Sequence, residues 1–211
     1  MRLPLRAVSL VAATGLLAAC AQTTADPRST SPSSSLSMAM PTSVPAAKGE
    51  VPALAMVIEK DDGPRACLGG VQESLPPQCD GPRLEGFQWS DVTSDEASGV
   101  KWAQPVRVTG TWDGTTLTLT EPAADEARPD TTAGPAPRTT CDDAERIHDE
   151  IWRDEDSLPP GALSGYPGSG CVELFVTYDD GSIQRALDAK YGDGVVVQSA
   201  LRPVGSGSST G

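Results

Sequence analysis

Residues 106–120 read VRVTGTWDGTTLTLT, and this stretch decides the fold class of the region around it. Apolar and polar residues alternate on both sides of the Asp113-Gly114 dipeptide. An Asp-Gly pair between two alternating segments is typical of a β-hairpin with a tight turn. The sequence therefore predicts an antiparallel hairpin here.

Working backwards from the hairpin, three further segments have strand character. Residues 51–60, 66–71 and 84–89 are short, rich in apolar residues and separated by turns that contain glycine and proline. About five short strands with this punctuation are typical of a small antiparallel β-barrel or a two-layer β structure. We expect an OB-like barrel over residues 51–121.

Residues 141–204 have a different pattern, in which helices and strands alternate. Helical spacing of apolar residues predicts two helices, one from about residue 144 and one over 182–191, and residues 172–178 and 195–201 read as strands. The Pro/Gly-rich segment 158–170 is expected to be a loop. The fold class is therefore α+β, a barrel-like module followed by an α-β-α-β unit with a right-handed βαβ crossover. We expect this small unit to pack against the barrel or to gain a strand from it.

The first 20 residues resemble the signal of a bacterial lipoprotein. Arg2 and Arg6 form a positively charged start, and residues 7–19 form an apolar run of 13 residues. This run is too short to span a bilayer, which takes about 20 residues. The run ends in LAAC at residues 17–20, which resembles a lipobox. The resemblance implies that residues 1–19 are removed and that acylated Cys20 anchors the protein in the membrane, on its extracytoplasmic face. The alternative is an ordinary signal peptide that contains a cysteine.

Three further segments have low complexity. Residues 20–50 are rich in Ser, Thr, Pro and Ala and predict a disordered tether between the anchor and the folded body. Residues 122–140 contain no Val, Ile, Leu, Met or aromatic residue and predict a linker. The last residues, 205–211, are expected to be a disordered tail.

The charge of the chain excludes one class of partner. The formal net charge is −13, so we expect repulsion from nucleic acid and from anionic lipid headgroups. Contact with the membrane is expected only through the acylated Cys20. No cofactor motif is present, and no cofactor is predicted.

Four cysteines remain when Cys20 is set aside. An even number outside the cytoplasm predicts two disulfides, for which three connectivities are possible. We favour Cys67–Cys79 and Cys141–Cys171, because each pair then lies within one module. No close spacing of Cys and His favours a metal site.

Few residues are candidates for catalysis or binding. His148 is the single histidine, and it lies between Ile147 and Ile151 on the apolar face of a predicted helix, where a structural role is expected. Two Asp-Asp-Gly runs, at 61–63 and 179–181, lack the spaced oxygen ligands of a calcium loop and are expected to be turns. Three tryptophans could form a ligand-stacking surface, although core packing is the expected role. They are Trp89, Trp102 and Trp112.

Several segments together resemble one group of proteins. They are CLGGV at 67–71, ESLPPQCDGP at 73–82, TGTWDG at 109–114, ALDAKYG at 186–192 and LRPV at 201–204. This combination looks like a group of actinobacterial cell-envelope lipoproteins and secreted proteins with no assigned activity. Gly70 stands where that group is expected to have proline. The resemblance implies a location and an architecture, and no mechanism.

The sequence favours a non-enzymatic binding or interaction module of the cell envelope, whose partner is an envelope protein or a small ligand. Two alternatives stay open. One is an enzyme of unfamiliar type that uses acidic residues or His148, and the other is an assembly factor for envelope proteins. The first predicts a cleft with converging titratable groups, and the second predicts co-purification with a defined partner.

Overall fold

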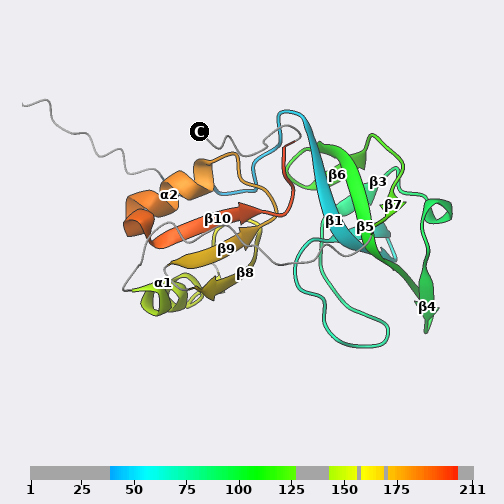
Figure 1. The fold of residues 1–211 in the computed structure, drawn as a ribbon, viewed down its shortest axis with the longest axis horizontal. Coiled ribbons are helices and arrows are strands. Elements are labelled where there is room, and N and C mark those ends of the chain that lie inside the picture. Colours follow the sequence, from blue (N-terminus) through cyan, green and yellow to red (C-terminus); the bar gives the residue numbers. More distant parts are fainter. Residues whose placement is uncertain (1–38, 127–142, 156–157, 169–170, 204–211) are drawn as a thin grey trace, which may run out of the picture. The chain divides into compact units, whose positions relative to one another are not determined.

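The computed structural model of the chain describes residues 39–126, 143–155, 158–168 and 171–203, which lie within one compact unit (Figure 1). A first sheet contains β1 (Glu50–Lys60), β2 (Gly63–Cys67), β3 (Arg83–Glu85), β4 (Asp95–Ala97), β5 (Val100–Trp112), β6 (Thr116–Leu119) and β7 (Ala124–Asp125). A second sheet contains β8 (Ala162–Pro167), β9 (Val172–Val176) and β10 (Val195–Ser199). The helices are α1 (Ala144–Ile151) and α2 (Ser182–Tyr191), with 3-10 turns η1 (Trp89–Asp91) and η3 (Gly192–Gly194).

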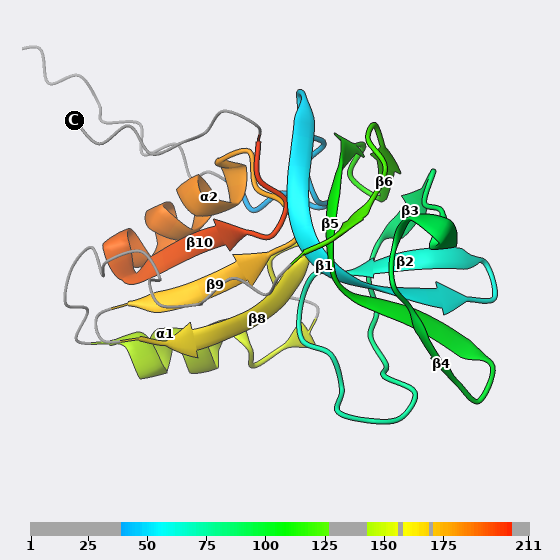
Figure 2. The same cartoon turned by 45° about the vertical axis from the view of Figure 1, so that its right-hand side comes forward.

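Strands of the first sheet close into a barrel (Figure 2). β1 pairs with β2 and β5, β3 joins β2 to β6, and β6 returns to β5, so the ring order is β1-β2-β3-β6-β5-β1. All neighbours in the ring are antiparallel except β3 and β6, which are parallel. Strand directions cannot alternate all the way round a ring with an odd number of strands, so one parallel pair is unavoidable. The predicted barrel is confirmed, as a closed mixed barrel of five strands.

The predicted hairpin is formed by β5 and β6, in which Trp112 pairs with Leu117. Asp113 closes the turn, because its Oδ1 accepts hydrogen bonds from the backbone N–H groups of Thr116 (2.7 Å) and Thr115 (2.8 Å). The same hydrogen bonds, that of Thr116 first, hold the pKa of the Asp113 carboxyl below its usual value. A short side chain that satisfies backbone donors is what makes aspartate favourable at this position.

The barrel core is built from alternate residues of β1 and from inward-facing residues of the other strands. The fully buried members include Val51, Val57, Ala66, Val106, Val108 and Leu117. The register between β1 and β5 shifts at a β-bulge between Ala55 and Val57. Around this bulge the opposite face of β1 is buried as well, because Met56 and Ile58 pack with Trp102 in a second, smaller core.

The C-terminal end of the segment predicted to be a tether, residues 20–50, is part of the folded body. Val44 and Ala47 pack on the barrel core. The indole Nε1 of buried Trp112 donates a hydrogen bond to the backbone oxygen of Pro45 (2.9 Å). The disorder prediction is therefore wrong for this end of the segment. Two apolar side chains of the segment pack on the barrel, and its backbone supplies the acceptor that the buried indole N–H of Trp112 needs. Residues 20–38 of the tether lie outside the described residues, as do the signal segment and Cys20.

The predicted linker, residues 122–140, also begins later than expected. Ala123 is buried, and β7 adds to the barrel edge by pairing with β5, where Ala124 lies opposite Arg107. A two-residue strand of Ala and Asp has no periodicity that a sequence pattern could reveal. Residues 127–140 lie outside the described residues, and so does the predicted tail.

In the second sheet, β9 is central, with β10 parallel on one side and β8 antiparallel on the other. The sequence β9, α2, β10 confirms the predicted parallel β-α-β crossover. β8 is a correction, because residues 158–170 were expected to form a loop. Its Gly165 is favoured by packing, since a Cβ there would lie 2.8 Å from Nε1 of Trp152, the residue that follows α1. Glycine thus serves helix packing inside a strand, against its low strand propensity.

Both helices cover one face of the second sheet (Figure 1). The buried residues of α1 are Ala144, Ile147 and Ile151, and those of α2 are Ile183, Ala186 and Leu187. The Asp179 carboxylate, at the start of α2, accepts hydrogen bonds from the N–H groups of Ile183 (2.9 Å) and Gln184 (3.1 Å). These hydrogen bonds satisfy backbone donors of the first turn of α2. The Asp-Asp-Gly run at 179–181 was predicted only to be a turn.

The Gln184 side chain covers the outer edge of β10. Its Oε1 accepts a hydrogen bond from the Val197 N–H (2.8 Å), and its Nε2 donates one to the Val195 oxygen (2.9 Å). The Ala200 N–H donates a hydrogen bond to the Val176 oxygen of β9. Backbone N–H groups of successive residues in a strand point to alternate edges, so the Val197 N–H, three residues earlier, points away from β9. The amide of Gln184 therefore occupies the place of a neighbouring strand.

The second sheet packs against the barrel, as expected, without gaining a strand from it. Leu201, just after β10, is fully buried in the barrel core, together with Tyr178 from the end of β9. The Arg202 N–H then donates a hydrogen bond to the Pro52 oxygen of β1 (3.2 Å). Residues of the C-terminal module thus complete the barrel core, while the helices and the second sheet keep a core of their own.

Candidate functional site

A groove of about 650 Å³ lies where the outer face of the barrel meets the second sheet. We call it the interface groove. Its apolar lining comes from both modules and consists of Pro52, Ala53, Leu54, Leu68, Phe175 and Ala200. Its polar lining consists of Arg107, Glu126, Ser199 and Arg202. Its volume is in the range of small-molecule sites, which occur preferentially at such junctions.

Strand alternation explains why these side chains face the groove. On β1 the buried residues Ala53 and Ala55 point into the barrel, so Leu54 between them points outward and is 37% exposed. Leu54 lies opposite Arg107 of β5, which faces outward as well. On β9 the neighbours of Phe175 are buried under the helices, so Phe175 projects from the opposite face of the sheet. The groove is thus lined mainly by outward-facing residues of the two modules, together with Ala53 and Leu68 at the border of the barrel core.

The charges of the interface groove are only partly balanced. Arg107 Nε lies 3.0 Å from Glu126 Oε2 in an ion pair. Arg202 donates its Nε–H to the Ser199 oxygen at 3.4 Å and forms no ion pair with any residue that the structure describes. With Glu126 negative and both arginines positive, the groove carries one excess positive charge in a chain whose net charge is −13.

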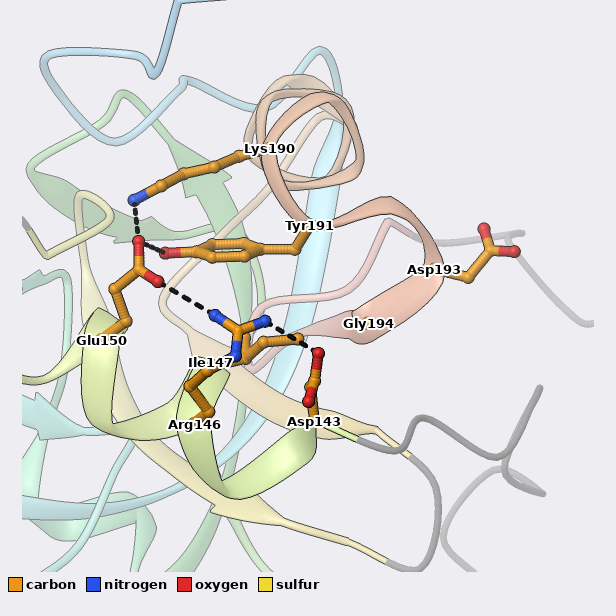
Figure 3. Close-up of a pocket in the computed structure, with 8 residues that line it drawn as sticks. All are labelled: Asp143, Arg146, Ile147, Glu150, Lys190, Tyr191, Asp193 and Gly194. Atoms are coloured by element: carbon orange, nitrogen blue, oxygen red, sulfur yellow. Dashed lines mark hydrogen bonds and ion pairs between the residues drawn. The ribbon is translucent and has the colours of Figure 1, made fainter.

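A second pocket, of about 540 Å³, lies between the two helices (Figure 3). Glu150 is its centre: one carboxylate oxygen accepts hydrogen bonds from Tyr191 OH (3.2 Å) and pairs with Lys190 Nζ (3.0 Å). The other oxygen pairs with Arg146 (3.4 Å), which also pairs with Asp143 (3.0 Å). The hydrogen bond from Lys190 holds the pKa of the Glu150 carboxyl below its usual value, so it stays ionised. The network binds α1 to α2, and its charged groups are engaged with one another.

The histidine proposed as structural joins α1 to β8. His148 Nε2 lies 3.2 Å from the Gly165 oxygen, and its ring centre is 6.3 Å from that of Trp152. The side chain is 27% exposed. It lines neither of the two pockets described above. These contacts support a role in packing α1 against the sheet.

We expect His148→Ala to lower the free energy of unfolding by about 0.5–3 kcal/mol, because the change removes a half-buried ring and its contact with Gly165. Urea denaturation of the purified protein measures the change. Glu145→Ala, at an exposed position on the same helix, is the matched control and should change stability by less than about 0.5 kcal/mol. Equal stability of His148→Ala and the parent protein would contradict the structural role.

The three candidate tryptophans do not form one stacking surface. Trp112 is buried in the barrel core, and Trp102 is buried in the smaller core. Trp89 is half-buried, where its Nε1 donates a hydrogen bond to Glu59 (2.6 Å) and Lys101 Nζ lies 4.8 Å from its ring centre. The structure thus favours core packing, the expected role, for the two buried residues.

The cysteines and the acidic turns have structural roles where the structure describes them. The predicted disulfide Cys67–Cys79 is present. Cys171 is also disulfide-bonded, and its predicted partner Cys141 lies outside the described residues. Over the described ranges, no group of three or more His, Cys, Asp or Glu side chains could hold a metal ion. Within the same ranges, no helix is both long and apolar enough to span a bilayer.

No family model, no curated protein and no solved structure matches the chain. The resemblance to envelope lipoproteins therefore stays a prediction. Function has to be inferred from the geometry of the interface groove and from the signal-like start of the sequence.

Proposed function

We propose that the chain is an extracytoplasmic lipoprotein, anchored by acylated Cys20, that binds a small ligand in the interface groove without turning it over. The observation that carries the binding function is the groove itself. It combines an apolar floor with a small number of charged groups at the junction of two modules, which is the usual composition of a small-molecule site.

Two features support binding over catalysis. The titratable groups gathered between α1 and α2 neutralise one another, and ionised Glu150 is unsuited to act as a general acid. His148, on which the enzyme alternative relied, contacts a backbone oxygen of β8. Neither group lines the interface groove.

The proposed anchor is compatible with the position of the folded body. Val44 is already packed on the barrel core, so 23 residues separate it from Cys20. Fully extended, that length of chain reaches at most roughly 80 Å. Val44 would therefore lie within this distance of the membrane surface.

A neutral apolar dye, N-phenyl-1-naphthylamine, tests the binding function. We expect saturable binding, seen as a rise in dye fluorescence, to the chain from Ala21 onward, which keeps every described residue. Leu54→Asp should weaken binding at least about tenfold, because burial of a leucine side chain contributes about 1.5–3 kcal/mol. Leu54 is a suitable target, since it is partly exposed and outside both cores.

Leu75→Asp is the matched control. Leu75 is 77% exposed, lies outside the groove and acquires the same charge, so dye affinity should not change. An equal loss of affinity in both variants, or the absence of saturable binding, would contradict the proposed function.

A further inference from the structure

The interface groove has a cation at its rim that the rest of the described protein leaves unbalanced. Arg107 is neutralised by Glu126, at 3.0 Å. Arg202 uses its Nε–H on the Ser199 oxygen, at a long 3.4 Å, and its side chain has no ion-pair partner within the described ranges. Arg153 and Arg185 likewise form no ion pair within the described ranges, and what distinguishes Arg202 is its place in the lining of an apolar groove.

The backbone holds this arginine beside the apolar floor. The Arg202 N–H is bonded to the Pro52 oxygen, and Leu54 is the next outward-facing residue of β1. Phe175 faces the groove from β9, and Leu68 closes it after β2. A cation and these apolar side chains therefore line the same groove.

We propose that the ligand of the interface groove is a single-chain amphiphile with a carboxylate head, which rests on the proposed binding function and specifies its chemistry. The carboxylate accepts hydrogen bonds from the free side of the Arg202 guanidinium, whose planar donors match two carboxylate oxygens. The alkyl chain lies along Leu54, Leu68 and Phe175. Burial of these apolar surfaces supplies the part of the affinity that does not depend on the head group of the ligand.

The net charge of the groove favours one kind of ligand head group over others. The excess of one positive charge matches a monoanion. A dianionic phosphate head would face the Glu126 carboxylate as well as the acidic surroundings. A cationic head would be placed against Arg202. The carboxylate is therefore the head that this arrangement fits best.

Four soluble probes test the assignment through displacement of N-phenyl-1-naphthylamine from the chain that begins at Ala21. Dodecanoate has the proposed head and tail, dodecyltrimethylammonium and dodecyl phosphate change only the head, and butyrate shortens the tail. We expect dodecanoate to bind at least about tenfold more tightly than dodecyltrimethylammonium. It should also bind more tightly than dodecyl phosphate. Butyrate should not displace the dye at the same concentrations.

Arg202→Gln should weaken dodecanoate binding about tenfold and change the affinity for the neutral dye by a clearly smaller factor, because only dodecanoate carries the carboxylate that pairs with the guanidinium. Arg153→Gln, at an exposed position near the end of α1, makes the same change of charge away from the groove and should leave both affinities unchanged. This control measures how far a more negative net charge by itself weakens the binding of an anionic ligand.

The outcomes separate the two claims. If the dye binds in the groove but Arg202→Gln leaves dodecanoate affinity unchanged, or if dodecyl phosphate binds more tightly than dodecanoate, the carboxylate assignment is wrong and the binding function stands. If neither dye nor dodecanoate binds, both are wrong.

Discussion

Replacing Cys20 by Ser should move the protein from the membrane fraction to the soluble fraction. A serine hydroxyl cannot replace the thiol that is acylated at a lipobox. Two or more acyl chains anchor a protein stably, whereas the apolar run before Cys20 is too short to span the bilayer. The expected result is therefore close to complete release once the signal is removed, measured by fractionation of cells that produce each form.

The control for this experiment removes two other cysteines. The double variant Cys67→Ser, Cys79→Ser lacks the disulfide of the barrel module and keeps Cys20, so it should remain with the membrane. Retention of Cys20→Ser in the membrane fraction would overturn the proposed anchor, and it would leave the groove proposal untouched.

Gly110→Ala should prevent folding. Gly110 pairs with Val51 on one side and with Leu119 on the other, so it lies where β1, β5 and β6 run side by side. A Cβ at this position would lie 2.2 Å from the backbone oxygen of Thr118. Backbone of a paired strand cannot move aside without opening the barrel. We expect a loss of more than about 4 kcal/mol, against a total stability of about 5–15 kcal/mol.

Circular dichroism and the cooperativity of thermal unfolding measure this loss. Gly49→Ala is the matched control, because Gly49 lies next to the start of β1 and a Cβ there would meet no atom within 4 Å. It should fold like the parent protein. Cooperative unfolding of Gly110→Ala within about 1 kcal/mol of the parent would show that the barrel tolerates the contact.

Local patterns predicted those elements whose structure is set by near neighbours. The β5–β6 hairpin follows from Asp113-Gly114 and the alternation around it, and α2 has the predicted bounds because the apolar spacing and the flanking glycine define them. β8 was missed, because Gly165 is present to admit the Trp152 ring from another element. The parallel β3–β6 pair follows from ring closure, which no local window contains.

The candidate site was largely beyond sequence reasoning. Leu54, Phe175 and Arg202 belong to distant segments, and only the packing of the C-terminal module on the barrel core brings them to one groove. Alternation along β9 puts Phe175 on the face opposite to Val172 and Leu174. This pattern indicates that the Phe175 side chain lies outside the core under the helices. The tryptophans were candidates because large aromatic rings can stack on a ligand, and two of them are core residues in the structure.

The amide of Gln184 on the edge of β10 bears on the proposed membrane-anchored form of the protein. Anchored molecules diffuse in two dimensions and meet one another far more often than the same molecules in dilute solution. An uncovered strand edge under these conditions is a template for pairing with the next copy. Because Gln184 already occupies the Val195 oxygen and the Val197 N–H, these two backbone groups are not available to a strand of a neighbouring copy.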